Sequence, residues 1–439
     1  MSPTVRIQKQ RDRTRRRRSR RISRLTRRGG FLLLFGVLAL GSSYWLGRSE
    51  LLYLGSFCAL LPLVALAYVR FRRMHFAVTR SFSPSVVSVG HPTVVEVEIT
   101  NLSQSASMEA NWRDSWPWQP FSTIPARLPA LLGRGPRPTK RGNSIRVRYS
   151  IQPPSRGVYQ VGPMLVDFSD PFGLAEGAFT TGPTAELIVT PSVTALADGV
   201  VSIAAADGRT RINQRRAFGG EDDLMTREYR RGDALRRVHW RASAHHGELM
   251  VRQEEQRSHA EARLLLDTRR TNYPDALAHG APEAVESESF EWAIALTASL
   301  GVHLQRSGFT VQIIETGHRQ VASLDRPEEF LESLASVALS DAGGAGDISL
   351  LRGVQRPDRS QGSVFVVLSD ADPETVDRLV AQRHAFDLAV AFLVSPRQLT
   401  LARTLTDAGW LCVTSAPGDP VHSAWLDLGA GLEVTRGRD

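Results

Sequence analysis

Residues 31–69 read FLLLFGVLALGSSYWLGRSELLYLGSFCALLPLVALAYV, two apolar runs joined by a short polar break. The runs cover residues 31–46 and 51–69, and the break between them contains Arg48 and Glu50. Helices of these lengths reach roughly 24 and 28 Å, close to the bilayer's hydrocarbon thickness of about 30 Å. The stretch therefore predicts a transmembrane helical hairpin over residues 30–73.

Basic residues flank the hairpin on both outer sides and predict its orientation. Residues 1–29 contain thirteen Lys and Arg residues against one Asp, and Arg70, Arg72 and Arg73 follow the second run. Because basic flanks stay on the cytoplasmic side, we expect a multi-pass protein of the inner (plasma) membrane with both termini in the cytoplasm. The tail, residues 1–29, is predicted to be disordered. It serves either as a topology signal or as a patch that binds anionic membrane lipid.

Two other interpretations of the apolar runs are less well supported. A secretion signal also places basic residues before an apolar run, but no small-residue cleavage pattern follows the first run, and the second would still anchor the product. A buried core hairpin would not explain why arginines stand at both of its ends.

Charge and cysteine content exclude several classes of protein. The net charge of +9 comes from the tail, and the rest of the chain is slightly acidic. A folded part without excess positive charge has no general attraction for nucleic acid, so we expect no nucleic-acid partner. With only two cysteines, Cys58 and Cys412, a disulfide framework, a structural zinc site and an iron–sulfur cluster are all disfavoured.

Behind the membrane segment the hydrophobic pattern changes to a period of two. In residues 95–100, Val and Ile alternate with Glu and Thr, which is typical of a strand with one solvated face. Similar patterns predict strands at residues 145–151, 164–168 and 187–189. Short strands separated by Gly and Pro indicate a small antiparallel β-sandwich over residues 74–195.

Within this domain, residues 125–142 are rich in Pro, Gly and Arg and predict a long loop. Trp112, Trp116 and Trp118 offer a patch for a partner, but packing in the core or in loops is the preferred interpretation. We find no catalytic constellation in this domain.

Segment 196–260 contains an arginine-rich box whose charges nearly balance. Residues 227–252 read REYRRGDALRRVHWRASAHHGELMVR. Guanidinium and carboxylate groups at this density can form bidentate networks, and the aromatic rings offer faces for stacking. Such a network can clamp two domains together or bind an anion or a partner's carboxylate, and both interpretations stay open. The candidate residues are Arg227, Glu228, Tyr229, Asp233, Arg236, Arg237, Trp240 and Arg252.

The box resembles the signature of the domain-of-unknown-function 58 family of bacterial membrane proteins. The matching elements are a Gly-rich start at residues 219–220, Arg-Glu-Tyr at 227–229, Gly-Asp at 232–233, Trp240 and Gly-Glu-Leu at 247–249. Upstream, Arg-Gly-Val-Tyr at residues 156–159 and Asp-Pro-Phe-Gly-Leu at 170–174 are similar to that family, as is the paired membrane span.

One departure concerns histidine. Family members often have Arg after the Ser-Ala pair, where this chain has His245 and His246. Together with His239 they suggest a metal site, but no carboxylate or Cys stands at a recurring ligand spacing.

Short buried strands alternate with helices over residues 261–439. Strands are predicted at residues 264–266, 310–315, 364–369, 388–394 and 410–414, and a helix at 287–306. Further helix starts are predicted where a capping residue precedes proline, at Asp325, Asp372 and Ser395. This alternation predicts an α/β doubly wound, mostly parallel sheet, which resembles a von Willebrand factor A domain.

Domains of that kind often bind a divalent cation through Asp-x-Ser-x-Ser after the first strand. Here the first place holds Asp267 and Thr268, and Arg269 falls where the first Ser ligand would be. A fixed positive charge opposes a cation. Asp370 ends a later strand, so Asp267 and Asp370 are weak metal candidates, and no other cofactor is expected.

The resemblance implies a function. It predicts an uncharacterised, non-enzymatic, membrane-anchored scaffold or adaptor that faces the cytoplasm. Relatives occur with MoxR-type AAA ATPases and with transglutaminase-like membrane proteins, which are therefore the expected partners besides membrane lipid. The alternatives are a small-anion sensor and an enzyme that acts on an anionic substrate with Asp233 or Glu228 as base. Nothing in the sequence resembles a catalytic triad, a nucleophile elbow or a P-loop.

Overall fold

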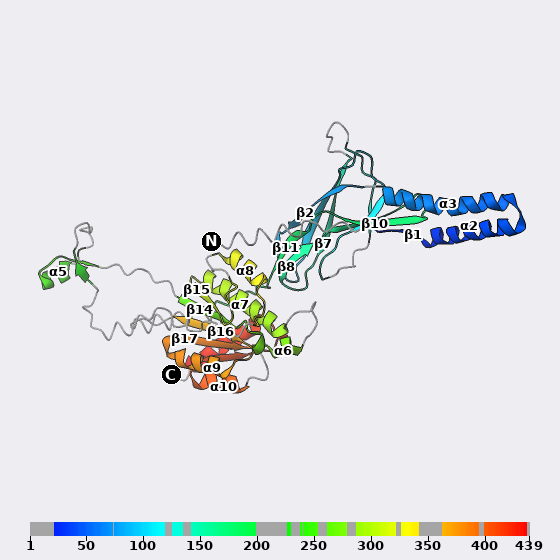
Figure 1. Cartoon of the computed structure of the whole chain (residues 1–439). Helices are drawn as coiled ribbons and strands as arrows, with labels where there is room; N and C mark the ends of the chain where they lie inside the picture. Colours follow the sequence, from blue (N-terminus) through cyan, green and yellow to red (C-terminus); the bar gives the residue numbers. More distant parts are fainter. Residues whose placement is uncertain are drawn as a thin grey trace, which may run out of the picture. The chain divides into compact units, whose positions relative to one another are not determined.

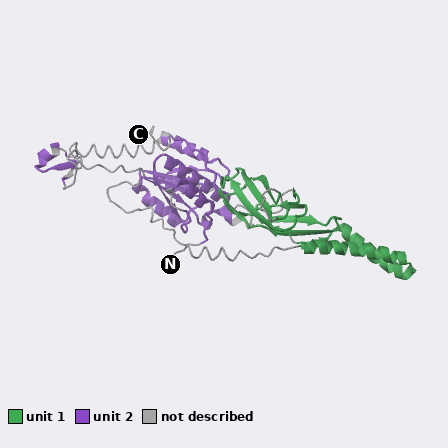
Figure 2. Ribbon diagram, turned by 90° about the horizontal axis from the view of Figure 1, so that it is seen from above, with its two compact units in different colours: residues 1–189 green, residues 190–439 purple. Residues whose placement is uncertain are grey.

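A computed structural model gives the arrangement of the chain (Figure 1). It describes residues 22–72, 74–118, 125–134, 142–198, 226–229, 238, 240–252, 261–278, 287–321, 326–341, 362–394 and 399–436. The chain divides into two compact units, residues 1–189 and 190–439 (Figure 2), and each is taken by itself below.

The predicted hairpin is present as two antiparallel helices, α2 (Arg27–Leu46) and α3 (Ser49–Phe71). They pack closely because glycines face the partner helix: a Cβ atom on Gly36 would lie 2.5 Å from the backbone nitrogen of Ala59. Only 17% of the most apolar window of α2 and 28% of that of α3 are buried. By length and composition both helices are long and apolar enough to cross a membrane. The low buried shares show that most of their apolar surface faces outward.

Ordered structure begins before the first helix. Strand β1 (Ile22–Leu25) pairs antiparallel with β10 (Ala175–Thr181), and Arg24 forms an ion pair of 2.5 Å with Glu176. The predicted disordered tail, residues 1–29, therefore does not extend over these residues. Local sequence does not reveal this strand, because its partner lies far along the chain.

The described β part of this unit contains three sheets around one core, two of them antiparallel throughout. Their orders are β1-β10-β9-β5-β6, β2-β4-β7 and β3-β11-β8. The remaining strands are β2 (Phe76–Ser83), β3 (Val86–Ser88), β4 (Thr93–Asn101), β5 (Ala110–Arg113), β6 (Ala126–Leu128), β7 (Ser144–Ile151), β8 (Gly157–Val161), β9 (Met164–Ser169) and β11 (Ala185–Thr190).

All four strands predicted from alternation in this unit are confirmed, as β4, β7, β9 and β11. The predicted loop at residues 125–142 contains the short strand β6, which pairs with β5 at its start. Trp112 and Trp116 are buried and Trp118 packs against the same core, so the interpretation of the tryptophans as packing residues is confirmed.

A buried ion pair joins two of these sheets. Arg80 on β2 donates from Nε and Nη2 to the two carboxylate oxygens of Asp114, at 2.7 Å each, and both side chains have almost no exposed surface. The hydroxyl of Tyr149 on β7 donates to the same carboxylate at 2.7 Å. Burial and the neighbouring negative charge raise the pKa of Tyr149 strongly.

The second unit contains a five-stranded sheet in the order β15-β14-β16-β17-β18, with every neighbouring pair parallel. Its strands are β14 (Glu261–Leu266), β15 (Thr310–Glu315), β16 (Ser363–Leu368), β17 (Leu388–Leu393) and β18 (Leu411–Thr414). The five predicted strands are thus confirmed. Their boundaries differ from the predicted ones by only a few residues.

Helices cover both faces of this sheet. Leu264 and Leu266 pack toward a core shared with α6 (Pro274–Ala278), α7 (Glu288–Arg306), α8 (Pro327–Ala335) and α11 (Val421–Arg436). Leu265 packs toward the opposite core, with α9 (Pro373–Gln382) and α10 (Leu399–Asp407). This is the doubly wound arrangement that the alternation predicts.

The predicted helix starts have different outcomes. Asp372 is the N-cap of α9 and accepts a hydrogen bond from the backbone N–H of Thr375. At α8 the N-cap is Arg326, since Pro327 begins the helix. Asp325 and Ser395 lie outside the described residues.

Candidate functional site

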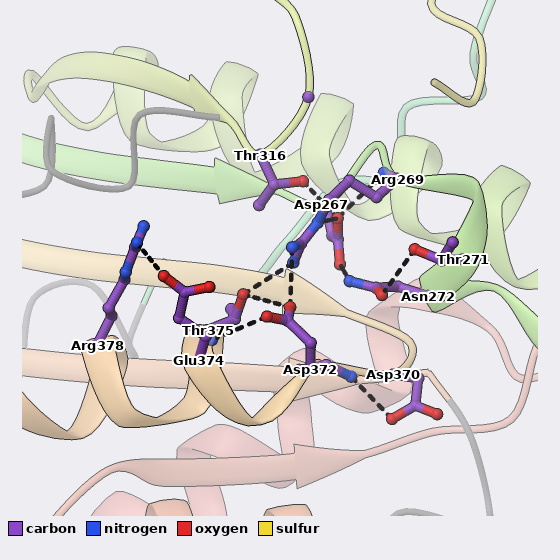
Figure 3. A network of polar contacts seen from close by, with 12 residues as sticks. Asp267, Arg269, Thr271, Asn272, Thr316, Asp370, Asp372, Glu374, Thr375 and Arg378 are labelled. Carbon is purple, nitrogen blue, oxygen red and sulfur yellow. Dashed lines mark hydrogen bonds and ion pairs between the residues drawn. The ribbon is translucent and has the colours of Figure 1, made fainter. Parts of the chain in front are cut away.

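The strand order of the parallel sheet reverses at β14, and that point creates the candidate site. The chain runs from β14 to β15 on one side and then crosses over to β16 on the other. Open parallel sheets bind ligands at the carboxyl ends of the strands on either side of such a reversal. Asp267, Thr316 and Asp370 stand directly after or near the ends of these three strands (Figure 3).

Asp267 is the centre of this edge and has no exposed surface. One oxygen, Oδ1, accepts from the hydroxyl of Thr316, and also from the backbone N–H of Arg269 at 3.1 Å. The other, Oδ2, accepts from the side-chain amide of Asn272 at 2.5 Å. Hydrogen-bond donors from two segments of the chain, the loop after β14 and the end of β15, thus surround the carboxylate.

Arg269 adds a positive charge to the same place. Its Nε lies 3.4 Å from Oδ1 of Asp267, and its Nη1 lies 2.8 Å from Oδ1 of Asp372. Its Nη2 donates to the hydroxyl of Thr375 at 2.9 Å. One guanidinium therefore links the end of β14 to the start of α9, as the dashed lines in Figure 3 show.

Asp372 keeps its negative charge in this arrangement. Burial alone would raise the pKa of its carboxyl, but the hydrogen bonds from Thr375 and the charge of Arg269 outweigh burial and lower the pKa. Asp372 therefore faces Arg269 as a carboxylate at neutral pH.

Asp370 lies beside this network rather than within it. Its backbone N–H donates to the carbonyl of Asn272 at 2.9 Å, and its side chain accepts from the N–H of Ala371 at 2.8 Å. Asn272 thus holds the ends of both strands, with its side chain on Asp267 and its carbonyl on Asp370.

The geometry is a poor fit for a divalent cation. A cation ligand must direct free lone pairs at the ion, whereas both oxygens of Asp267 accept hydrogen bonds. Arg269 fills the neighbouring position with a fixed charge of the same sign as a metal ion. Within the described part of the chain, no three His, Cys, Asp or Glu side chains gather as metal ligands would.

The arginine-rich box begins and ends in a two-stranded hairpin, β12 (Thr226–Glu228) and β13 (Met250–Arg252). Arg227 lies opposite Val251, and the N–H of Tyr229 donates to the carbonyl of Leu249 at 2.8 Å. Backbone pairing between β12 and β13 therefore brings the first and last residues of the arginine-rich box together.

Between these strands lies a short helix, α5 (Trp240–His246). Trp240, its first residue, has 69% of its surface exposed. The rings of His245 and His246 are 5.5 Å apart. Asp233, Arg236, Arg237 and His239 lie outside the described residues.

A comparison with protein families finds a match to part of the chain. Residues 225–404 match the family described as "Protein of unknown function DUF58". This DUF58 match covers the box from Arg227 onward and the parallel sheet as far as α10. It therefore supports the family resemblance over these residues, and the family's description leaves the activity open. A comparison with curated proteins found no match.

Solved structures give only weak likenesses. The CARDB domain of a Pyrococcus furiosus protein, described as a complex with di-metal ions, is 13% identical, with a TM-score of 0.19 over 27% of this chain and 94% of that chain. A family two carbohydrate esterase from Cellvibrio japonicus is 8% identical, with a TM-score of 0.20 over 83% of this chain and 98% of that chain. Scores at this level carry no argument about fold or function.

Several residues of the site are not found by sequence reasoning. Asn272, Thr316 and Thr375 come from three separate segments, and no motif marks them. Arg269 is noticeable in the sequence as an unexpected residue at a ligand position. The ion pair between Arg269 and Asp372 could not be foreseen, because the sequence pattern around Asp372 is fully explained by its role as a helix cap.

Proposed function

We propose that this chain is a membrane-anchored scaffold or adaptor, with both units facing the cytoplasm, that docks a protein partner such as a MoxR-type AAA ATPase. The second unit would be a von Willebrand factor A-like docking domain. A transglutaminase-like membrane protein is a further partner that the family resemblance suggests.

The observation that carries this proposal is the way the hairpin joins the β sheets. β1 precedes α2, and β2 follows α3, yet both strands lie in the same compact unit. A compact unit of this kind needs both strands on the same side of a membrane, which supports the proposal that the two outer ends of the hairpin lie on one side. The arginines at these ends favour the cytoplasmic side.

The same strand argues against a cleaved signal sequence. Cleavage after the first apolar run would remove β1 and leave one edge of β10 unpaired. A buried core hairpin is disfavoured too, because large apolar side chains on both helices face outward, among them Phe31, Leu38, Phe57 and Leu63.

The edge of the parallel sheet favours docking over catalysis. Its most buried carboxylate, Asp267, is held by hydrogen bonds and by Arg269, so it is not free to act as a base or a nucleophile. Trp240 presents an exposed aromatic ring, the kind of residue that anchors protein interfaces.

Two reporters test the anchor. One is fused after Asp439, and the other is inserted between α2 and α3 at Gly47 in a separate chain. We expect the first to report from the cytoplasm and the second from the opposite side. A carboxyl-terminal reporter on the extracytoplasmic side would refute the proposed orientation and with it a cytoplasmic partner.

A pull-down tests the partner. Detergent-solubilised protein is compared with Trp240→Ala and with Leu426→Ala, a matched change of an apolar residue that is 57% exposed on α11. We expect a MoxR-type ATPase to co-purify with the parent and with Leu426→Ala, and to be lost from Trp240→Ala. Equal recovery from all three proteins would exclude Trp240 from the docking surface, and absence of the ATPase from the parent would refute this partner.

A further inference from the structure

We infer that Phe172, at the tip of the turn between β9 and β10, is a second membrane contact that inserts between lipid headgroups beside the hairpin. This inference rests on the proposed membrane anchor. It assigns a role to the Asp-Pro-Phe-Gly-Leu stretch, which the scaffold function leaves unexplained.

The turn holds its shape through a buried carboxylate. Asp170, only 4% exposed, accepts from the N–H of Phe172 at 2.8 Å and from the N–H of Ala175 at 2.6 Å. Gly173 takes a left-handed conformation, with φ of 69°, which side chains with a Cβ rarely adopt. The backbone on both sides of Phe172 is therefore held in place, so the residue keeps its position at the tip of the turn.

The turn is also fastened to the first membrane helix. The hydroxyl of Thr26, the N-cap of α2, donates to the carbonyl of Gly173 at 2.7 Å, and its N–H donates to that of Leu174 at 2.9 Å. Gly29 lies so close that a Cβ atom would come within 2.1 Å of the Leu174 oxygen. The height of the turn along the membrane normal is thus set by the start of α2.

That height corresponds to the headgroup layer. Thr26 precedes Phe31, the first residue of the apolar run, by five residues, or about 7 Å of helix. The polar layer on each side of the hydrocarbon is about 5 to 7 Å thick. A phenylalanine that projects from this height reaches the boundary between headgroups and acyl chains.

The surroundings favour lipid over a protein as the occupant. Phe172 is 68% exposed, and Phe31 in the second turn of α2 is 72% exposed, so both the turn and the helix it is bonded to present an aromatic side chain to the outside. Arg27 and Arg28 are exposed in the first turn of α2, directly after Thr26, and positive charges at this level suit anionic headgroups. Aromatic residues with basic neighbours are typical of segments that lie in the interface.

Site-directed spin labels test the depth of Phe172. In a background of Cys58→Ala and Cys412→Ser, single cysteines are placed by Phe172→Cys, Leu38→Cys and Val158→Cys in the full chain. The protein is reconstituted into phosphatidylcholine–phosphatidylglycerol vesicles. Leu38 lies within α2, and Val158, 45% exposed, belongs to β8, a strand that Figure 1 shows away from α2 and α3.

Accessibility to oxygen, which concentrates in lipid, is compared with accessibility to a water-soluble nickel chelate. We expect the label at 172 to favour oxygen several-fold more than the label at 158, at a depth shallower than that at 38. If 172 matches 158 while 38 lies in lipid, the inference is wrong although the anchor stands. If 38 also contacts water, both proposals fail.

A second variant separates insertion from folding. Phe172→Ser removes an exposed side chain, so the melting temperature should stay within about a degree of the parent, since no buried contact is lost. In the same vesicles, a spin label at the neighbouring position, introduced by Pro171→Cys, should nevertheless lie closer to water when Phe172→Ser is present than when it is absent. An unchanged depth at this position would contradict a role for the phenylalanine ring.

Discussion

The Nε atom of Arg269 lies 3.4 Å from Oδ1 of Asp267, a carboxylate with no exposed surface at the end of the first strand of the parallel sheet. The protein thereby supplies its own cation at a position where open parallel sheets in general can take a ligand. A serine at this position would instead offer a hydroxyl ligand.

Arg269→Ser should create a cation site. It would leave Asp267 and Thr271 in an Asp-x-Ser-x-Thr pattern and remove the opposing charge. We expect Mg²⁺ to raise the melting temperature of this variant and not that of the parent, because a ligand that binds only the folded state stabilises it by about 2.7 kcal/mol at 100 times Kd. Adding Asp267→Asn should abolish the effect. A magnesium response in the parent would contradict the site as described.

Arg80→Met should destabilise the first unit strongly. It leaves Asp114 buried without its bidentate partner, a change that costs about 3 to 5 kcal/mol. The matched control is Arg148→Met, which breaks the exposed pair with Glu96 and should cost less than about 1 kcal/mol. Chemical denaturation of the two variants in the same detergent measures the difference, and equal losses would refute the importance of the buried pair.

Tyr149 should make stability depend on alkaline pH. Burial and Asp114 raise its pKa in the folded protein, so the folded state keeps the phenol proton that the unfolded state loses above about pH 10. The stabilising contribution is complete below the unfolded pKa and is lost as pH rises beyond it. The free energy of unfolding should fall less steeply from pH 9 to 11 in Tyr149→Phe than in the parent. Parallel slopes would show that this phenol is not the titrating group.

Two neighbouring glycines should respond oppositely to alanine. At Gly29 a Cβ atom would collide with the carbonyl of Leu174, whereas at Gly30 nothing lies within 4 Å. Gly30→Ala should stabilise α2 by up to about 1 kcal/mol, because alanine is the better helix former. Gly29→Ala should lower the melting temperature and separate β1 from β10. Thermal melts in detergent compare them, and similar shifts would argue against the close contact.

Local patterns predict those parts of the fold whose cause is local. Val95, Val97 and Ile99 alternate with polar residues, and β4 lies where they do, with all three side chains fully buried. The apolar runs likewise predict α2 and α3. By contrast, β1 and the Arg80–Asp114 pair depend on contacts between distant residues, which no local pattern contains.

The candidate site shows the same division. Asp267, Arg269 and Asp370 are conspicuous because they stand at the ends of recognisable strands. Asn272, Thr316 and Thr375 complete the network only after the strands are ordered side by side, and Ser, Thr and Asn at loop positions are too common to be distinctive.

The pairing of β1 with β10 also sets an order of events during synthesis. Arg24 leaves the ribosome well before Glu176, its partner 152 residues later. The sheet that contains both strands can be completed only after α2, α3 and the strands up to β10 have been synthesised. β1 would thus remain without its partner strand while α2 and α3 are made, and its pairing with β10 would fix the base of a helical hairpin that is already complete.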